Sequence, residues 1–174
     1  GECCQEEIER VSDLVRNVSA DVLIGVGGGK TLDTMKAVAS ELGLSLIIVP
    51  TSASTDAPTS AMSVLYTKDG TYIKNIRHKK NAVLVLMDTE IISKAPIRLF
   101  ISGMGDALAT YFEAMANDAS DSTNYIGKGY RRCKAAMAIA KACFEILMED
   151  GIKAKLALER NICSEAVENV IEAN

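Results

Sequence analysis

The stretch "GVGGGKTLDT", residues 25–34, places three consecutive glycines before a lysine and a threonine, a composition typical of phosphate-binding turns. A P-loop requires G-x-x-x-x-G-K-[ST], but Ile24 stands where the first glycine of that motif should be. The dinucleotide fingerprint G-x-G-x-x-G begins correctly at Gly25 and Gly27, but Lys30 occupies its third glycine position. Neither named motif applies, so the surroundings of the glycines decide what the stretch can do.

The surroundings predict a strand–turn–helix–strand unit. Residues 21–26, "DVLIGV", form a short apolar run rich in β-branched residues, typical of a buried parallel strand. Residues 31–42 follow helical spacing and Gly43 is placed to end the helix, after which residues 44–50, "LSLIIVP", predict a second buried strand. This order is the βαβ crossover of an α/β domain.

In that context the glycines at residues 27–29 favour phosphate binding. Without side chains, the turn lets a pyrophosphate approach the backbone, and the unpaired amides of the first helical turn point towards it. The alternative is a tight turn that only packs the strand against the helix.

The remainder of the chain divides into two parts by its patterns. A surface helix is predicted at residues 5–18, a hairpin around Asp69-Gly70, and a third buried strand at residues 82–89. From Pro96 onwards the pattern is helical. We therefore expect a partial Rossmann-like α/β domain with a parallel sheet over residues 1–95, and a partial all-helical domain over residues 96–174 with a polar loop at 117–129.

Composition limits the classes of partner. The net charge of -4 argues against nucleic acid or an anionic membrane as a partner, and no apolar run reaches the length of a membrane span. Five cysteines without a C-x-x-C pair favour reduced thiols in a cytoplasmic protein over a disulfide or zinc framework. The chain begins with Gly1 and ends in an amphipathic helical run without a stop signal, so we expect a piece of a longer polypeptide.

A loop dense in hydroxyl groups follows the second predicted strand. Residues 51–60, "TSASTDAPTS", should lie at the carboxyl edge of the sheet, where ligands bind in open α/β folds. Asp56 is the one charge among these residues. A ligand site and an ordinary Ser/Thr turn before Pro58 fit the residues equally well.

Two further positions carry candidate chemistry. Asp106 shares a helical face with Thr110 and Glu113, where it could bind a cation or, in a first turn capped by Ser102, only stabilise the helix dipole. His78 lies in the basic run "KNIRHKKN" and is expected to be a solvated surface residue. We expect that run to protect a sheet edge rather than to bind an anion.

Three motifs, "GGGKTLDT", "PTSASTDAPTS" and "SGMGDALATYFEA", together resemble the glycerol dehydrogenases of the iron-containing, or metal-dependent polyol, dehydrogenase superfamily. The resemblance runs from "GECC" to "VIEAN" and is strongest through residue 115. It implies NAD-dependent oxidation of glycerol, or a similar vicinal diol, to dihydroxyacetone by a cytoplasmic homo-oligomer. In such an enzyme Zn²⁺, or another divalent ion such as Fe²⁺, activates the substrate hydroxyl.

The resemblance also implies roles for individual residues. Asp56 matches the contact to the substrate hydroxyl, and Asp106 matches one of three metal ligands, which favours the metal interpretation of that residue. The other two ligands are histidines that the resemblance places after residue 174, and a lone carboxylate holds zinc poorly, so the 174-residue chain alone is expected to be inactive. Cofactor contacts are implied at Gly28, Gly29, Lys30, Thr31, Asp33, Thr51, Ser54, Ser60, Met62 and Tyr66.

Other functions remain open on the residues alone. Glycerol-1-phosphate dehydrogenases and dehydroquinate synthases share the general architecture, but they need cationic side chains for their anionic substrates, and the loop 51–60 contains none. A nucleotide-binding protein without catalysis and a pure interaction fragment are the alternatives from other classes.

Overall fold

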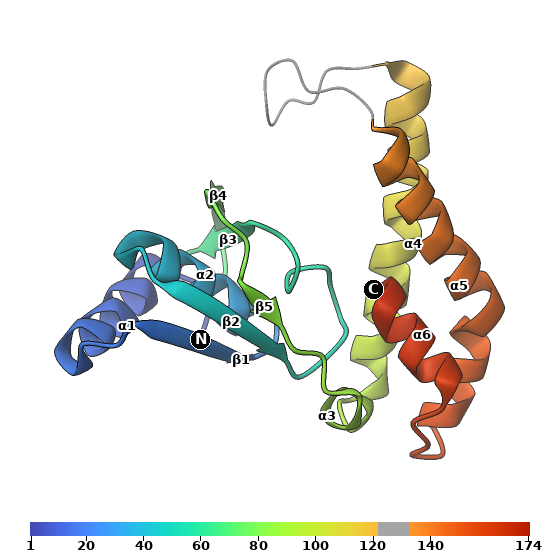
Figure 1. Cartoon of the computed structure of the whole chain (residues 1–174), viewed down its shortest axis with the longest axis horizontal. Helices are drawn as coiled ribbons and strands as arrows, with labels where there is room; N and C mark the ends of the chain where they lie inside the picture. The colour runs from blue at the N-terminus through green and yellow to red at the C-terminus, as the bar shows by residue number, and fades with distance from the viewer. Residues whose placement is uncertain (122–132) are drawn as a thin grey trace. The chain divides into compact units, whose positions relative to one another are not determined.

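The computed structural model describes residues 1–121 and 133–174 (Figure 1). The chain divides into two compact units, the first made of residues 1–52 and 56–92 and the second of residues 53–55 and 93–174. The first is α/β with a parallel sheet and the second is helical, so the predicted fold class is confirmed.

The first unit is built on a parallel sheet with the strand order β1-β2-β5. Its strands are β1 (Val22–Gly27), β2 (Ser45–Pro50) and β5 (Leu84–Val85). Between β1 and β2 the chain forms α2 (Gly29–Leu42), which ends at Gly43 in the left-handed conformation (φ 70°). The predicted βαβ crossover is therefore confirmed.

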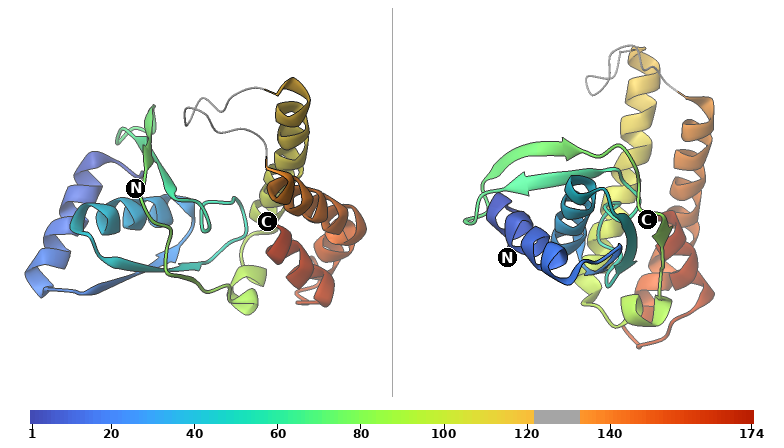
Figure 2. Two further views of the ribbon diagram at one scale, coloured as in Figure 1. Left: turned by 45° about the horizontal axis from the view of Figure 1, so that its top comes forward. Right: turned by 60° about the vertical axis from the view of Figure 1, so that its left-hand side comes forward.

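Helix α2 packs against β1 and β2, and α1 (Gln5–Val18) packs against α2 (Figure 2). The buried apolar side chains of this unit include Leu32 and Val38 of α2 and Ile48 of β2. Gly25 brings β1 close to the helix, because an added Cβ would lie 3.1 Å from the Cβ and Cγ of Met35. Small residues at such positions allow the close strand–helix contact that the crossover needs.

The burial predicted for the first and third strands is wrong on one face. In β1, Leu23 is 5% exposed but Ile24 is 57% exposed, so burial alternates along the strand. Leu84 of β5 is also half exposed, and that strand spans only two residues. The reason is that α2 covers one face of the sheet, and no helix among the described residues covers these side chains on the other.

A separate antiparallel hairpin completes the first unit. It consists of β3 (Met62–Tyr66) and β4 (Tyr72–Arg77), joined by a turn in which Gly70 has φ 87°. Glycine adopts that conformation without steric cost, so the predicted Asp-Gly hairpin is confirmed.

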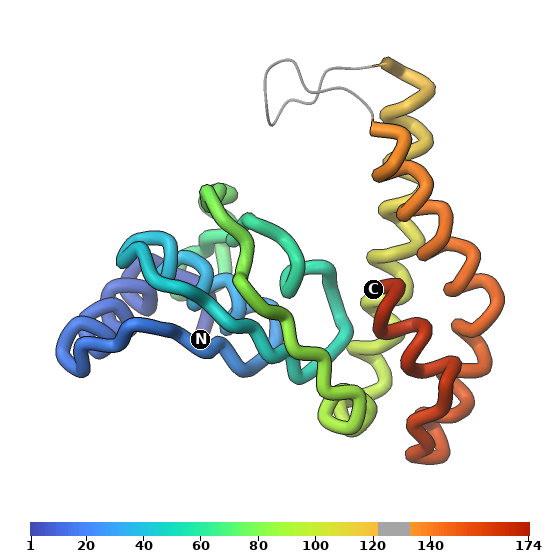
Figure 3. Tube along the Cα trace, viewed as in Figure 1, coloured from blue at the N-terminus to red at the C-terminus, as the bar shows by residue number. Residues whose placement is uncertain are grey.

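The second unit is formed mainly by α4 (Ile97–Ser120), α5 (Lys134–Leu158) and α6 (Glu165–Ala173). Helix α5 packs against both of the others, and Figure 3 traces the antiparallel course of α4 and α5. The short helix α3 (Thr89–Ser93) precedes them. The loop predicted at 117–129 is wrong for residues 117–120, which continue α4, and residues 122–129 lie outside the described residues.

A close backbone contact at Gly103 fixes the start of α4 within this unit. An added Cβ would lie 2.2 Å from the carbonyl oxygen of Ala53 and 2.0 Å from Nδ2 of Asn174. The Asn174 side chain donates a hydrogen bond to the same carbonyl at 2.8 Å.

In the part of the chain that the structure describes, no helix is long and apolar enough to cross a membrane.

Candidate functional site: the glycine turn and its supporting cluster

The turn between β1 and α2 contains one glycine required by the backbone and one that leaves open space. Gly27 has φ 156°, and an added Cβ would lie 2.8 Å from the Cβ and Oγ1 of Thr31. Gly28 is the N-cap of α2 with φ -87° and ψ -179°, which any residue adopts. An added Cβ at Gly28 would meet only the Oγ of Ser52, at 3.8 Å. The space above Gly28 is therefore free for a ligand that approaches the backbone.

The first turn of α2 presents main-chain amides that have no acceptor within the helix. The first intrahelical bond there is donated by the amide of Leu32 to the carbonyl of Gly28, at 3.1 Å. The amides of Gly29, Lys30 and Thr31 precede that bond, so they have no acceptor within the helix. The helix dipole adds a positive potential at the same end, and the first turn contains no acidic residue to oppose it. This arrangement suits an anionic group such as a pyrophosphate.

The loop after β2 is joined directly to this turn. The amide of Thr51 donates a hydrogen bond to the carbonyl of Gly27 at 3.0 Å, which brings the two carboxyl-end loops together. Ser52, which is buried, is the side chain that the structure places nearest to Gly28. Sequence reasoning selected Thr51 but not Ser52. The strand register could have identified it, because Gly27 lies opposite Pro50 and the two loops therefore begin at the same level.

Lys30 is paired at the surface rather than held open for a phosphate. Its Nζ forms an ion pair with the carboxylate of Glu2, while its side chain is 62% exposed. The side chain of Glu2 is only 20% exposed, so the pair is open to water mainly on the Lys30 side. A phosphate that arrives at the turn therefore competes with Glu2 for the Lys30 ammonium group.

Asp33 is engaged inside the protein. One carboxylate oxygen forms an ion pair with Lys36 at 2.8 Å, and the other accepts the amide N–H of Val64 at 2.9 Å. The hydroxyl of Ser63 donates to the main-chain carbonyl of Asp33 at 2.7 Å. These bonds tie α2 to β3. The structure thus places Asp33 where it supports the site, and its predicted contact with a cofactor stays a prediction.

Lys36 is a residue that sequence reasoning missed. Its side chain is 4% exposed, and its Nζ donates to the carbonyls of Ala57 (2.9 Å), Ser60 (3.4 Å) and Met62, as well as to the Oγ of Ser60 (3.3 Å). One buried ammonium group therefore holds the loop that leads into β3, including two predicted cofactor-contact residues. The sequence did indicate that Lys36 is buried, because it lies four residues after Leu32 and so on the buried face of α2.

The prediction that His78 is a solvated surface residue is wrong. The residue is half-buried and its Nε2 lies 2.8 Å from the Oγ of Ser63. Because the Ser63 hydroxyl gives its hydrogen to Asp33, the Nε2 of His78 is the donor in this pair. Burial lowers the pKa of His78, the nearby Lys36 cation lowers it further, and Asp33 opposes both. The neutral imidazole therefore belongs to the folded state.

Other predicted contact residues are held by main-chain bonds. The carbonyl of Asp56 accepts the amide and hydroxyl of Thr59, at 3.0 and 3.2 Å, so residues 56–59 form a turn, and the Asp56 side chain is exposed. The amide of Tyr66 donates to the carbonyl of Cys3 at 2.8 Å, and its ring packs edge-on against Tyr72. Ser54 belongs to the second unit and is half-buried.

Asp106 does not occupy the first turn of a helix. Since α4 begins at Ile97, Ser102 is not an N-cap, and the interpretation of Asp106 as a dipole-stabilising residue is wrong. Asp106 is exposed, and its carbonyl accepts the hydroxyl of Thr110 at 3.1 Å. Among residues 1–121 and 133–174, no group of three or more His, Cys, Asp or Glu side chains could hold a metal ion. The single carboxylate falls short of the three protein ligands usual for catalytic zinc.

Comparisons with known proteins identify the family of the chain. Residues 1–89 match the family described as iron-containing alcohol dehydrogenase. A glycerol dehydrogenase from Thermotoga maritima is 48% identical over 174 residues, which is 100% of this chain and 47% of the relative. The glycerol dehydrogenase from Escherichia coli O6:H1 is 46% identical over 175 residues, again covering 100% of this chain and 47% of the relative.

A solved structure gives the same result for the fold. The crystal structure of a probable glycerol dehydrogenase from Sinorhizobium meliloti 1021 superimposes with a TM-score of 0.93 at 46% identity, over 99% of this chain and 48% of that one. The chain therefore spans about half the length of the relatives that it matches.

Proposed function

This chain belongs to the iron-containing alcohol dehydrogenase family, and on that premise we propose that it serves the NAD-dependent oxidation of glycerol, or a similar vicinal diol, to dihydroxyacetone. The observation that carries the proposal is the open glycine turn, in which Gly28 leaves the N-terminus of α2 accessible to a pyrophosphate. The relatives called glycerol dehydrogenase that align over the whole chain support the choice of substrate.

In the proposed complex the pyrophosphate of NAD accepts hydrogen bonds from the amides of Gly29, Lys30 and Thr31. The Lys30 ammonium group, whose side chain is 62% exposed, turns from Glu2 to the phosphate. NAD supplies the hydride acceptor, and the protein positions it. We assign further cofactor contacts to the loop and strand residues Thr51, Ser52, Ser54, Ser60, Met62 and Tyr66.

Asp33 and Lys36 act indirectly in this proposal. Their ion pair and the bonds from Lys36 to the carbonyls of Ala57 and Met62 fix the loop from which Asp56 projects. Asp56 accepts a hydrogen bond from a hydroxyl of the diol and orients it. Asp106 is assigned as one carboxylate ligand of a divalent cation, Zn²⁺ or Fe²⁺. Because the described residues do not complete a ligand set, we derive no catalytic step through the ion.

A phosphorylated polyol is the weaker choice of substrate. The loop 51–60 itself contains no cationic side chain, and the ammonium group of Lys36, which reaches it, is buried and paired with Asp33. Within the loop, a substrate phosphate would therefore meet the carboxylate of Asp56 together with carbonyl and hydroxyl oxygens.

Steady-state kinetics of NADH formation, measured on the native polypeptide and its variants rather than on the 174-residue chain alone, test the role of Asp56. Asp56→Ala is expected to raise the KM for glycerol about tenfold or more, because one hydrogen bond to the diol is lost, while the KM for NAD changes less than about twofold. Asp33→Asn is the comparison variant, because Asp33 supports the loop that carries Asp56 and is not assigned a contact with the diol. An equal rise of both KM values in Asp56→Ala contradicts the assignment.

A nucleotide-binding protein without catalysis is the second candidate, because the glycine turn serves either function and the described residues offer a single assigned metal ligand. Saturable NADH binding without turnover of glycerol in the presence of Zn²⁺, measured on the native polypeptide from its source cells, identifies that alternative. Activity that depends on Zn²⁺ and is lost in Asp106→Ala identifies the dehydrogenase.

A further inference from the structure

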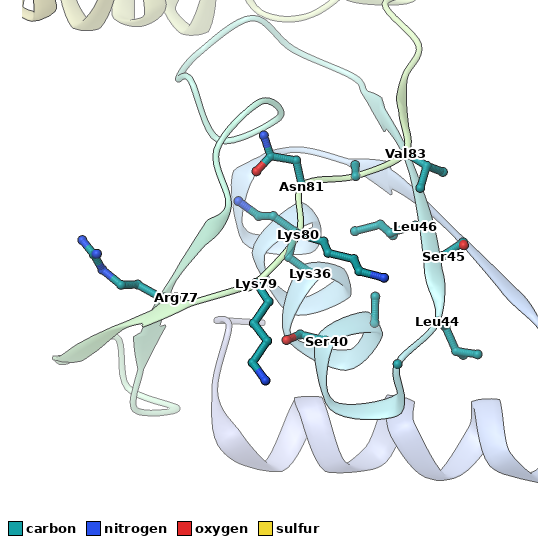
Figure 4. Close-up of a pocket in the computed structure, with 13 residues that line it drawn as sticks. Lys36, Ser40, Leu44, Ser45, Leu46, Arg77, Lys79, Lys80, Asn81 and Val83 are labelled. Atoms are coloured by element: carbon teal, nitrogen blue, oxygen red, sulfur yellow. The ribbon is translucent and has the colours of Figure 1, made fainter. Parts of the chain in front are cut away.

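A basic cavity lies at the opposite end of β2 from the glycine turn. It has a volume of about 390 Å³, and its walls come from the last turns of α2, the first residues of β2 and the segment 77–83 that follows the hairpin (Figure 4). Because β2 starts at Ser45 in this cavity and ends at Pro50 beside Gly27, the two sites occupy different edges of the sheet. The volume is within the range of about 300–1,000 Å³ that is usual for small-molecule sites.

The charge of the cavity walls is strongly positive. Lys36, Arg77, Lys79 and Lys80 line it, and none of its lining residues is acidic. The buried Lys36 is balanced by Asp33. Arg77, Lys79 and Lys80 form no ion pair with any residue that the structure describes. In Figure 4, Lys79 and Lys80 lie beside α2 and β2, whereas Arg77 extends away from them.

Neither ordinary role of surface lysines accounts for this concentration of charge. Helix α2 has no basic residue in its last turn, so its C-terminus attracts nearby cations, but it carries only about half a negative charge. The helix end therefore accounts for only part of the attraction on two ammonium groups, both of which are exposed. Protection of the edge of β4 is not sufficient either, since Lys79 and Lys80 come after the strand has ended at Arg77.

The other walls suit an organic molecule. Ser40, Ser45 and Asn81 offer polar side chains, while Leu44, Leu46 and Val83 offer apolar contact. A ligand that complements both must combine an anionic group with a small apolar body. Two flexible ammonium groups act as point charges and match a phosphomonoester, which is close to a dianion at neutral pH.

We propose that this cavity binds a small organic phosphate, with the flexible and exposed side chains of Lys79 and Lys80 turning towards the phosphate group and the organic part against Leu44 and Leu46. The site is independent of the glycine turn and of the function proposed for it. A phosphate bound there contacts both α2 and the segment that carries His78 into its contact with Ser63.

Titration with phenyl phosphate, followed by amide chemical shifts of the 174-residue chain, tests the site. The expected result is saturable shifts confined to residues 39–46 and 77–83, which weaken as salt is added. Phenol, which has the same ring without the charge, is expected to cause no saturable shift. Shifts confined to residues 27–31, equal shifts with phenol, or no saturable shift overturn the proposal.

Matched variants assign the effect to the two lysines. Lys79→Gln/Lys80→Gln is expected to weaken phenyl phosphate binding at least about tenfold, because two of the positive charges that line the cavity are removed. Lys74→Gln removes an exposed charge of β4 that is not part of the cavity, and is expected to change binding less than about twofold. Equal binding by the double variant and the unaltered chain overturns the assignment even where wild-type binding is seen.

Discussion

Replacing Lys36 by methionine tests whether the buried ion pair organises the loop before β3. Methionine keeps an unbranched side chain of similar length, so the change removes the charge and the hydrogen bonds with little loss of volume. The substitution leaves the Asp33 carboxylate, 12% exposed, without the ammonium group that now lies 2.8 Å away. Breaking a buried pair by removing one partner costs about 3–5 kcal/mol.

Further loss comes from the carbonyl oxygens of Ala57 and Met62, which lose their donor. Each can recover part of its bonding from water, so we expect about 3–5 kcal/mol in total. That is a large fraction of the 5–15 kcal/mol typical of a folded domain. Urea unfolding at neutral pH, followed by circular dichroism, measures the change through the midpoint and slope.

Two controls separate the pair from a general effect of substitution. Lys74→Met alters an exposed lysine of β4 and is expected to stay within about 0.5 kcal/mol of wild type. Asp33→Asn combined with Lys36→Met removes the stranded charge, and is expected to be about 2 kcal/mol more stable than Lys36→Met alone. A loss below about 1 kcal/mol in Lys36→Met, or a double variant whose loss equals the sum of the two single losses, refutes the reasoning.

Three further changes follow from particular contacts. Gly103→Ala is expected to lower the free energy of unfolding by about 1–3 kcal/mol, because its Cβ would overlap the carbonyl of Ala53. Gly105→Ala, whose Cβ meets open space, is the control in the same urea assay. Equal stability of the two variants would contradict the close contact at Gly103. Gly27→Ala is expected to cost a similar amount, through its positive φ and its overlap with the next helix turn, and wild-type stability in calorimetry would show that the turn relaxes freely. The pKa of His78 is lowered in the folded state, so the unfolded chain binds a proton more readily below about pH 6.5. The urea midpoint is therefore expected to fall between pH 7 and pH 5.5, and His78→Gln is expected to lose the part of this pH dependence that comes from the imidazole. An unchanged pH dependence of the midpoint in His78→Gln argues against the burial of the imidazole.

Local signals made much of the first unit predictable. Apolar runs bounded by glycine predict β1, α2 and β2, and Gly43 marks the end of the helix at the residue where the structure ends it. Asp69-Gly70 predicts the hairpin for the same reason, since the turn needs a residue with positive φ. These features depend on neighbours in the chain, and so one sequence is enough to find them.

Features that depend on distant neighbours were not predictable. The position of Lys36 on the buried face of α2 indicates burial, but no periodicity shows that its Nζ binds carbonyl groups more than twenty positions later. Nor does any periodicity show that the imidazole of His78 lies against the hydroxyl of Ser63. The start of α4 was placed too late because Ser102 is a good N-cap residue, while the structure begins the helix directly after Pro96. Burial of β1 on both faces was overestimated because an apolar run does not show whether both faces of a sheet are covered.

Binding of NADH at the glycine turn is the central claim, and a fluorescence titration of the 174-residue chain tests it most directly. The wild-type chain and Gly105→Ala are expected to bind NADH saturably and with equal affinity. Gly28→Ala is expected to bind at least about tenfold more weakly, a difference of about 1.4 kcal/mol, at an unchanged urea midpoint, because its methyl group enters only the open space above the turn. Equal NADH affinity in Gly28→Ala and the wild type, or no saturable binding by the wild type, would contradict the account.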